Sequence, residues 1–221
     1  MGSMRITHLG HACLLVECAG TRLLIDPGTF ADDLTGVRDL DAVLVTHQHP
    51  DHLDLGRVPA LLAANPGALV VADPGSLEVL VQAGIEAQGH DGPTRVGEVT
   101  VTPVGEVHAL IHDEIPRIPN VGVRLDAGGE PSFFHPGDAL DADPGPVDVL
   151  AFPLQAPWAR SREMTAFLRR HAAPHAVPVH DGLLQARGRA LYLGQAEQLG
   201  SPDTRIHDLA GAGPTEFREG E

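Results

Sequence analysis

Short runs of apolar residues, separated by turn residues, occupy the first half of the chain, and this pattern is typical of β-strands. Two of these runs flank Ala19-Gly20, which predicts a hairpin turn between them. The run 42–45 is apolar at every position, which predicts a strand buried on both faces. The pattern predicts strands at residues 5–9, 12–18, 22–25, 42–45, 69–72, 99–104, 121–125, 132–134, 147–151 and 176–179.

Apolar residues at helical spacing lie between several of these runs. Met164, Phe167 and Leu168 fall on one side of a predicted amphipathic helix, whereas Gly188 and Gly194 weaken the helix expected to close the chain. The predicted helices are residues 59–64, 75–83, 161–170 and 183–199. Because strands and helices are mixed throughout, we expect an α/β sandwich.

A chain of 221 residues fits one domain with a sizeable core, and we place that domain at residues 4–210. Residues 1–3 precede a second methionine and resemble residues left by an expression vector, so we leave them out of the expected fold. The polar, glycine-rich tail 211–221 is expected to be loose. No apolar run approaches the ~18 residues that cross a bilayer, and no signal-peptide pattern is present, so we expect neither segment.

The formal net charge of −15 narrows the range of partners. Phosphate backbones and anionic membrane surfaces attract basic proteins, so we expect neither nucleic acid nor a membrane as partner. Cys13 and Cys18 fall on opposite parities of one predicted strand, so they should face opposite sides and form no disulfide. As small buried apolar residues they suit a reducing cytosol, and we expect a cytoplasmic protein.

The segment His47-Gln48-His49-Pro50-Asp51-His52 directly follows the fully apolar run 42–45. Imidazole and carboxylate groups are the ligands that zinc and similar ions accept. Pro50 indicates a loop, in which His47 and His49 can converge on one ion while Asp51 and His52 point to a neighbouring position. The alternative is a solvated histidine-rich loop, which the buried strand leading into it disfavours. The segment therefore predicts a site for two metal ions.

The same segment, with Thr46, resembles the THxHxDH signature of the metallo-β-lactamase superfamily. Further segments resemble other elements of that family: THLGHA at 7–12, LIDPG at 24–28, FHPGD at 134–138 and PVHD at 178–181. The first two are similar to the opening strands of the branch that contains ascorbate-phosphate lactonase. The similarity runs from Met4 to about Leu199, with the motifs in family order.

This resemblance implies a four-layer αββα sandwich, in which two mixed β-sheets are flanked by helices. It also implies three sets of metal ligands, one for each ion and one shared. The first ion would be held by His47, His49 and His108, the second by Asp51, His52 and His180, and Asp138 would bridge them. Asp26 would fix the signature loop by hydrogen bonds.

Several positions keep two interpretations. His108 follows a predicted strand, which favours it as the third-motif ligand, but His112 lies four residues on and is the rival. We expect His11 and His135 to hydrogen-bond beside the ligands rather than to ligate. Trp158 either lines a substrate pocket or anchors the core.

Two divalent ions ~3.5–4 Å apart can share a bridging hydroxide, which attacks a substrate at neutral pH. Zinc is the expected metal, and manganese or iron(II) accept the same ligands. Asp51 or Asp138 would help to pass a proton to the leaving group. We therefore expect hydrolysis of a small-molecule ester, lactone, thioester or amide.

Three alternatives remain open. A phosphodiesterase or nuclease would need a basic track or an arginine clamp, for which Arg117, Arg160 and Arg162 are the candidates. A mononuclear iron redox enzyme is the second, and a non-catalytic metal-binding module is the third. The sequence leaves the substrate, the native metal and the oligomeric state open.

Overall fold

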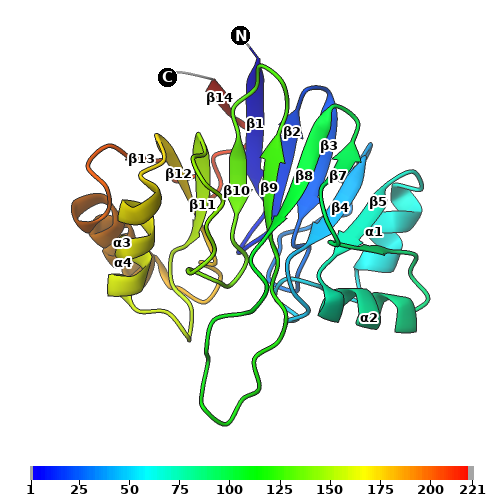
Figure 1. Cartoon of the computed structure of the whole chain (residues 1–221), viewed down its shortest axis with the longest axis horizontal. Helices are drawn as coiled ribbons and strands as arrows, with labels where there is room; N and C mark the ends of the chain where they lie inside the picture. The colour runs from blue at the N-terminus through cyan, green and yellow to red at the C-terminus, as the bar shows by residue number, and fades with distance from the viewer. Residues whose placement is uncertain (1, 219–221) are drawn as a thin grey trace.

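Two seven-stranded sheets face each other in the computed structural model, which describes residues 2–218 (Figure 1). The first sheet has the order β14-β1-β2-β3-β4-β5-β6, antiparallel from β14 to β3 and parallel from β3 to β6. Its strands are β1 (Ser3–His8), β2 (Leu14–Cys18), β3 (Thr21–Ile25), β4 (Ala42–Val45), β5 (Leu69–Ala72), β6 (Gln88–Gly89) and β14 (Thr215–Arg218).

The second sheet repeats this arrangement in the order β13-β12-β11-β10-β9-β8-β7. It is antiparallel from β7 to β10 and parallel from β10 to β13. Its strands are β7 (Thr94–Val96), β8 (Val99–Val104), β9 (Gly122–Asp126), β10 (Phe133–His135), β11 (Val149–Pro153), β12 (His175–Val179) and β13 (Arg205–Ile206).

The four helices lie on the outer faces of the two sheets (Figure 1). They are α1 (Val58–Ala64) and α2 (Pro74–Gln82) beside the first sheet, and α3 (Ser161–His171) and α4 (Ala186–Leu199) beside the second. The predicted αββα sandwich is therefore confirmed. No helix among residues 2–218 is long and apolar enough to cross a membrane.

Three apolar clusters fill the spaces between these layers. One lies between the sheets, one between the first sheet and its helices, and one between the second sheet and its helices. Strand β4 is buried at every position: Leu44 joins the inter-sheet cluster and Val43 joins the cluster under the helices, as its uniform apolarity predicts. Cys13 and Cys18 are free, and they lie in these two different clusters.

The structure corrects the expected ends of the domain. Residues 215–218, expected to be loose, form strand β14 against β1, with Phe217 only 2% exposed in the inter-sheet cluster. One apolar residue between polar neighbours is too short a signal for a strand, and the partner strand supplies the rest. Ser3, which we left out of the fold, is the first residue of β1. Met1 and residues 219–221 lie outside the described residues.

Candidate metal centre

Loops at one edge of the sandwich bring the candidate ligands together. The loop after β4 carries His47, His49, Asp51 and His52, while the other three candidates follow strands of the second sheet. These are His108 after β8, Asp138 after β10 and His180 after β12. Ligands from both sheets thus meet where these strands end, which is why residues so distant in sequence share one site.

The side chains form two groups, and within each group the ligand atoms lie within 4.8 Å of one another. One group is His47, His49, His108 and Asp138; the other is His11, Asp51, His52 and His180. Asp138 also lies between the groups, because its two carboxylate oxygens are each 3.2 Å from an Nε2 atom of the second group, in His52 and His180. The structure brings together all seven side chains that the sequence analysis assigns to metal binding.

Hydrogen bonds on the outer edges of the imidazole rings set their tautomers. The Nδ1–H of His52 donates to Asp26 at 2.7 Å, that of His108 to the Ala109 carbonyl at 2.6 Å, and that of His180 to the Gln155 carbonyl at 2.9 Å. Because carbonyl and carboxylate oxygens only accept, the protons must sit on Nδ1. Each neutral ring then turns the lone pair of its Nε2 toward the centre, as a metal ligand requires.

His47 and His49 complete the first group with opposite nitrogen atoms. The Thr46 hydroxyl donates to Asp26 at 2.7 Å, so it accepts from the Nδ1–H of His47 at 3.1 Å. The freed Nε2 of His47 faces Nδ1 of His49 at 3.1 Å. With the His49 proton on Nε2, these two facing nitrogens would be neighbouring ligands of one ion.

A cation would satisfy polar atoms that the protein itself leaves unpaired. Nε2 of His52, His108 and His180 and Oδ1 of Asp138 are buried without a hydrogen-bond partner. Each such atom costs about 1–3 kcal/mol when it is left unsatisfied. All four belong to the two groups, and imidazole nitrogen with carboxylate oxygen is a donor set for borderline divalent ions. The residues present therefore fit a pair of metal ions.

The carboxylates also control the charge of the rings around them. Burial opposes the charged form of His180, but Asp138 and Asp51 outweigh it and raise the pKa of its imidazole to about 9. Burial likewise opposes protonation of His52, yet Asp138 and Asp26 raise its pKa well above the usual value. Without metal, His180 is therefore protonated at neutral pH, and the raised pKa of His52 favours its charged form as well.

Metal binding should release protons at pH 7–8, because a ligating imidazole must lose the proton that the metal-free protein holds below its raised pKa. We expect at least about one proton per chain from His180 and His52, and an apparent affinity that rises as the pH increases toward 9. Calorimetric titration in two buffers of different ionisation enthalpy measures the release. Identical heats in both buffers would contradict this charge assignment.

Asp26 fixes the signature loop by hydrogen bonds to Thr46 and His52. Its carboxylate is completely buried and accepts from the Thr46 backbone N–H at 2.8 Å, the Thr46 hydroxyl at 2.7 Å and the His52 ring at 2.7 Å. It therefore fixes both the start of the loop and the orientation of one ligand. These contacts match the loop-fixing role that the family resemblance implies.

Gly28 lets the loop pass close to the chain after β3. A Cβ atom at this position would lie 1.9 Å from the Asp51 carbonyl oxygen and 2.5 Å from the His52 nitrogen. These are backbone atoms, so Gly28→Ala should displace the loop, lower the free energy of unfolding by about 1–3 kcal/mol and weaken the ion site at Asp51 and His52. Urea unfolding and the metal retained after dialysis measure the two effects. Gly36→Ala, with no atom within 4 Å, is the matched control; full metal retention in Gly28→Ala would contradict the prediction.

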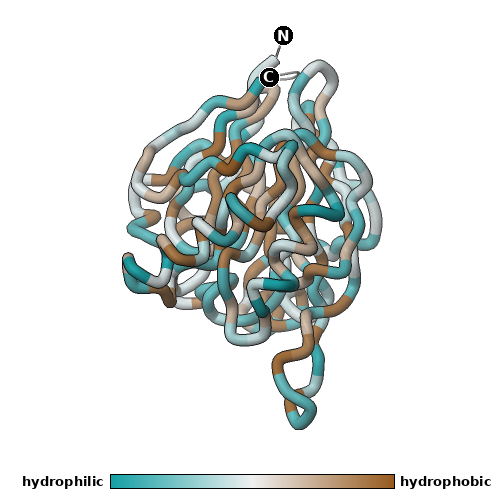
Figure 2. The backbone as a smooth tube through the Cα atoms, turned by 90° about the vertical axis from the view of Figure 1, so that its left-hand side faces the viewer, coloured by the Kyte–Doolittle hydropathy of each residue, from teal (hydrophilic) through white to brown (hydrophobic). Residues whose placement is uncertain are grey.

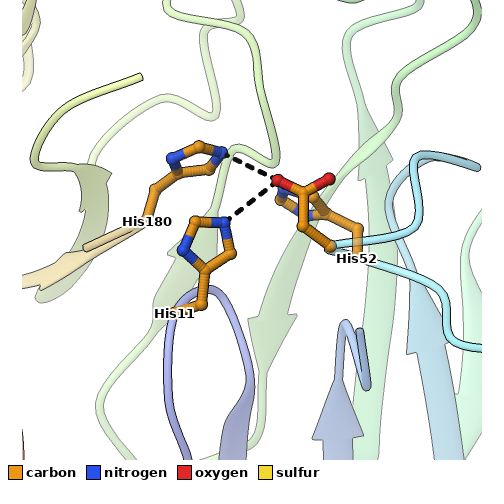
Figure 3. Close-up of side chains that lie close together, drawn as sticks. His11, His52 and His180 are labelled. Carbon is orange, nitrogen blue, oxygen red and sulfur yellow. Dashed lines mark hydrogen bonds and ion pairs between the residues drawn. The ribbon is translucent and has the colours of Figure 1, made fainter. Parts of the chain in front are cut away.

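His11 stands with the second group but has the wrong tautomer for a ligand. The Gly182 backbone N–H donates to its Nδ1 at 3.0 Å, so the neutral ring carries its proton on Nε2. That Nε2–H donates to Asp51 at 3.1 Å, and Figure 3 shows the His11 and His180 rings turned toward the same point. Burial lowers the pKa of His11, which keeps the ring neutral. His11 thus orients the Asp51 carboxylate, as the sequence analysis expects.

The remaining candidates have separate places. His135 is buried; its Nε2–H donates to the Ala12 carbonyl at 3.1 Å, and it ties the strand before Asp138 to the His11 loop. His112 is exposed on the loop between β8 and β9 and belongs to neither ligand group among residues 2–218, which leaves His108 as the third-motif ligand by geometry.

Trp158 is half-buried, and its indole Nε1–H donates to Asp138 at 2.8 Å. It borders the metal centre rather than anchoring the apolar core. Sequence reasoning missed this contact, and it also missed the backbone groups of Ala109, Gln155 and Gly182 that set the tautomers. Backbone donors and acceptors leave no signal in a single sequence.

The chain is similar to known proteins along most of its length. Residues 5–180 match a family model described as the beta-lactamase superfamily domain. Protein Rv0786c of Mycobacterium tuberculosis is 42% identical over 204 residues, which cover 92% of this chain and 96% of that protein.

Two solved structures share the fold. Igni18, described as a novel metallo hydrolase from the archaeon Ignicoccus hospitalis, matches with a TM-score of 0.71 at 18% identity, covering 98% of this chain and 99% of that one. YhfI from Bacillus subtilis, described as a metallo-beta-lactamase fold protein, matches with a TM-score of 0.73 at 16% identity and the same coverage. At such identities the likeness concerns the fold alone.

Proposed function

The chain belongs to the metallo-β-lactamase superfamily, and from this premise we propose that it is a hydrolase that uses two divalent metal ions to cleave a small-molecule ester, lactone, thioester or amide. The observation that carries the proposal is the convergence of seven ligand side chains, four of whose polar atoms are buried and unpaired. Burying so many unpaired polar groups costs free energy, and a purely structural role would not offset that cost.

His47, His49 and His108 would hold one ion, Asp51, His52 and His180 the other, and Asp138 both. When bound, the ions supply a water of lowered pKa and polarise the substrate oxygen. Zinc is the metal we propose, because imidazole and carboxylate ligands suit it. A cytoplasmic location and kinship with the ascorbate-phosphate lactonase branch stay predictions.

The two carboxylates are suited to different tasks. The side chain of Asp138 is 4% exposed and accepts from Trp158, so it is enclosed and fixed in orientation. The side chain of Asp51 is 23% exposed. Burial alone would raise its pKa, but the His11 hydrogen bond and the neighbouring His180 imidazole hold that pKa below its usual value. Asp51 is therefore better placed to exchange a proton with solvent or with a leaving group. Asp138 is better placed to bind both ions.

Phosphodiester hydrolysis is the second candidate, because two of the three arginines considered in the sequence analysis lie near the centre. Arg117 and Arg160 line a pocket beside Trp158, whereas Arg162 does not. They are two positions rather than a continuous basic track, which favours a small anion over a nucleic acid.

The test is elemental analysis of protein purified without added metal, followed by hydrolysis assays on ester, lactone, thioester, amide and phosphodiester panels. We expect about two ions per chain and turnover of a carboxylic acid derivative that chelation abolishes and metal restores. One iron per chain with oxygen consumption would overturn the proposal in favour of a redox enzyme. Turnover of phosphodiesters alone would replace it with the second candidate.

A further inference from the structure

A pocket of about 750 Å³ lies beside the metal centre. One wall is the long loop between β8 and β9, which projects from the body of the molecule (Figures 1 and 2), and the other is the segment that leads into α3. Its apolar lining includes Leu110, Ile111 and Trp158, and its basic lining is Arg117, Arg160 and Arg170.

The wall of this pocket is continuous with the ligand shell. Trp158 lines the pocket and donates to Asp138 at 2.8 Å. Arg117 also lines it, and its Nε–H donates to the His108 carbonyl at 2.7 Å. A molecule in the pocket would therefore lie against residues that contact two metal ligands directly.

The projecting loop exposes more apolar surface than a solvated loop needs. Four large apolar side chains within nine residues are exposed: Val107 at 37%, Leu110 at 52%, Ile111 at 37% and Ile115 at 48%. Two of them, Leu110 and Ile111, line the pocket beside Trp158. Such an apolar wall next to a few polar groups is typical of small-molecule sites.

The charge of the pocket differs from that of the molecule. The whole chain has twice as many acidic as basic residues, 30 against 15, whereas the pocket lining has three of each. One of the three acids, Glu163, accepts from the Arg160 backbone N–H at 2.9 Å. Arg117 uses only its Nε–H, and its two terminal nitrogens have no hydrogen-bond partner within residues 2–218. The N–H groups on these two nitrogens can therefore donate a pair of hydrogen bonds to a carboxylate or a phosphate.

We propose that this pocket binds an amphipathic anionic substrate, with its carboxylate or phosphate on Arg117 and its apolar part against Trp158, Leu110 and Ile111. The inference rests on the proposed function, since it places the scissile bond at the metal centre next door. It narrows the substrate class to acid derivatives that carry a second, anionic group.

Trp158 is the sole tryptophan of the chain, so its fluorescence reports on this pocket. Metal-loaded protein is titrated with 4-phenylbutyrate, phenyl phosphate and the neutral isostere 4-phenylbutyramide. We expect at least one of the anions to bind about tenfold or more tightly than the amide, which corresponds to ~1.4 kcal/mol. Whichever anion binds more tightly shows whether the pocket prefers a carboxylate or a phosphate.

Arg117→Gln should remove this preference with the metal content unchanged, whereas Arg162→Gln, the same change outside the pocket, should keep it. Ile111→Asp, on the exposed loop, should weaken binding of the anions more than binding of the amide, and its metal content is measured in the same way. This variant replaces Arg117→Gln as the test if Arg117→Gln loses metal. A preference that survives both pocket variants would overturn the inference, because the anion would then be binding the ions. Turnover is not needed for this readout, so failure of the hydrolysis panel stays a separate result.

Discussion

Asp138→Asn should abolish hydrolysis while the protein stays folded. Asp138 lies within 3.4 Å of the Nε2 atoms of His52, His108 and His180, so among residues 2–218 it is the one carboxylate that reaches both ligand groups. Burial alone would raise the pKa of Asp138, yet these imidazoles hold it well below its usual range, and the negative charge is what asparagine removes. Loss of a buried charged partner costs about 3–5 kcal/mol, which corresponds to roughly 10²- to 10⁴-fold weaker metal binding.

Elemental analysis after dialysis, far-ultraviolet circular dichroism and turnover of a substrate found with the panel check this expectation. Asp203→Asn is the matched control, because that side chain is exposed and away from the centre. In Asp138→Asn the charged acceptor of the Trp158 indole N–H becomes a neutral amide, so the Trp158 emission should shift. Retention of both ions with undiminished turnover would remove Asp138 from the centre.

Asp26→Ala should produce the largest loss of stability, although Asp26 is not itself a ligand. The substitution leaves three buried donors, two on Thr46 and one on His52, without an acceptor. Breaking such a buried charged network costs about 3–5 kcal/mol, a large part of the 5–15 kcal/mol typical of a domain. His52 also loses the partner that sets its tautomer, so the second ion should bind more weakly.

Denaturant unfolding of the metal-free protein separates the stability effect from the metal effect. Asp73→Ala is a matched control, because Asp73 is equally buried at the end of the next strand but only caps α2, by accepting from Gly75 and Ser76. That variant should lose about 1 kcal/mol and keep both ions. Asp26→Asn keeps one acceptor oxygen for Thr46, so its loss of stability should lie between those of Asp26→Ala and Asp73→Ala. Equal stability of the Asp26 and Asp73 variants would contradict this account.

Most of the fold follows from patterns that a single sequence contains. The strand at 42–45 and the strand at 69–72 are predicted to the residue, because apolar runs bounded by turn residues have few other interpretations. The short strands β6, β7 and β13 escaped prediction, since segments of two or three residues carry little periodicity and are set by their neighbours. Strand β14 escaped for the same reason, with Phe217 as its one apolar residue.

The candidate site divides in a similar way. Histidines and aspartates at strand ends are visible in the sequence, and their full grouping into two sets is implied by the resemblance to the metallo-β-lactamase superfamily. The role of His11 depends on the Gly182 N–H, 171 positions away, and that of Trp158 on an indole aimed at Asp138. Contacts of this kind arise from packing of the two sheets and have no local pattern.

Each ligand group draws on both sheets: His47 and His49 meet His108, while Asp51 and His52 meet His180. An ion bound by either group would consequently be a non-covalent cross-link between the two halves of the sandwich. By mass action, an ion present at 100 times its dissociation constant adds about 2.7 kcal/mol to the folded state. The supply of metal in its surroundings would thus govern how firmly the two halves of this molecule are joined, as well as whether it can react.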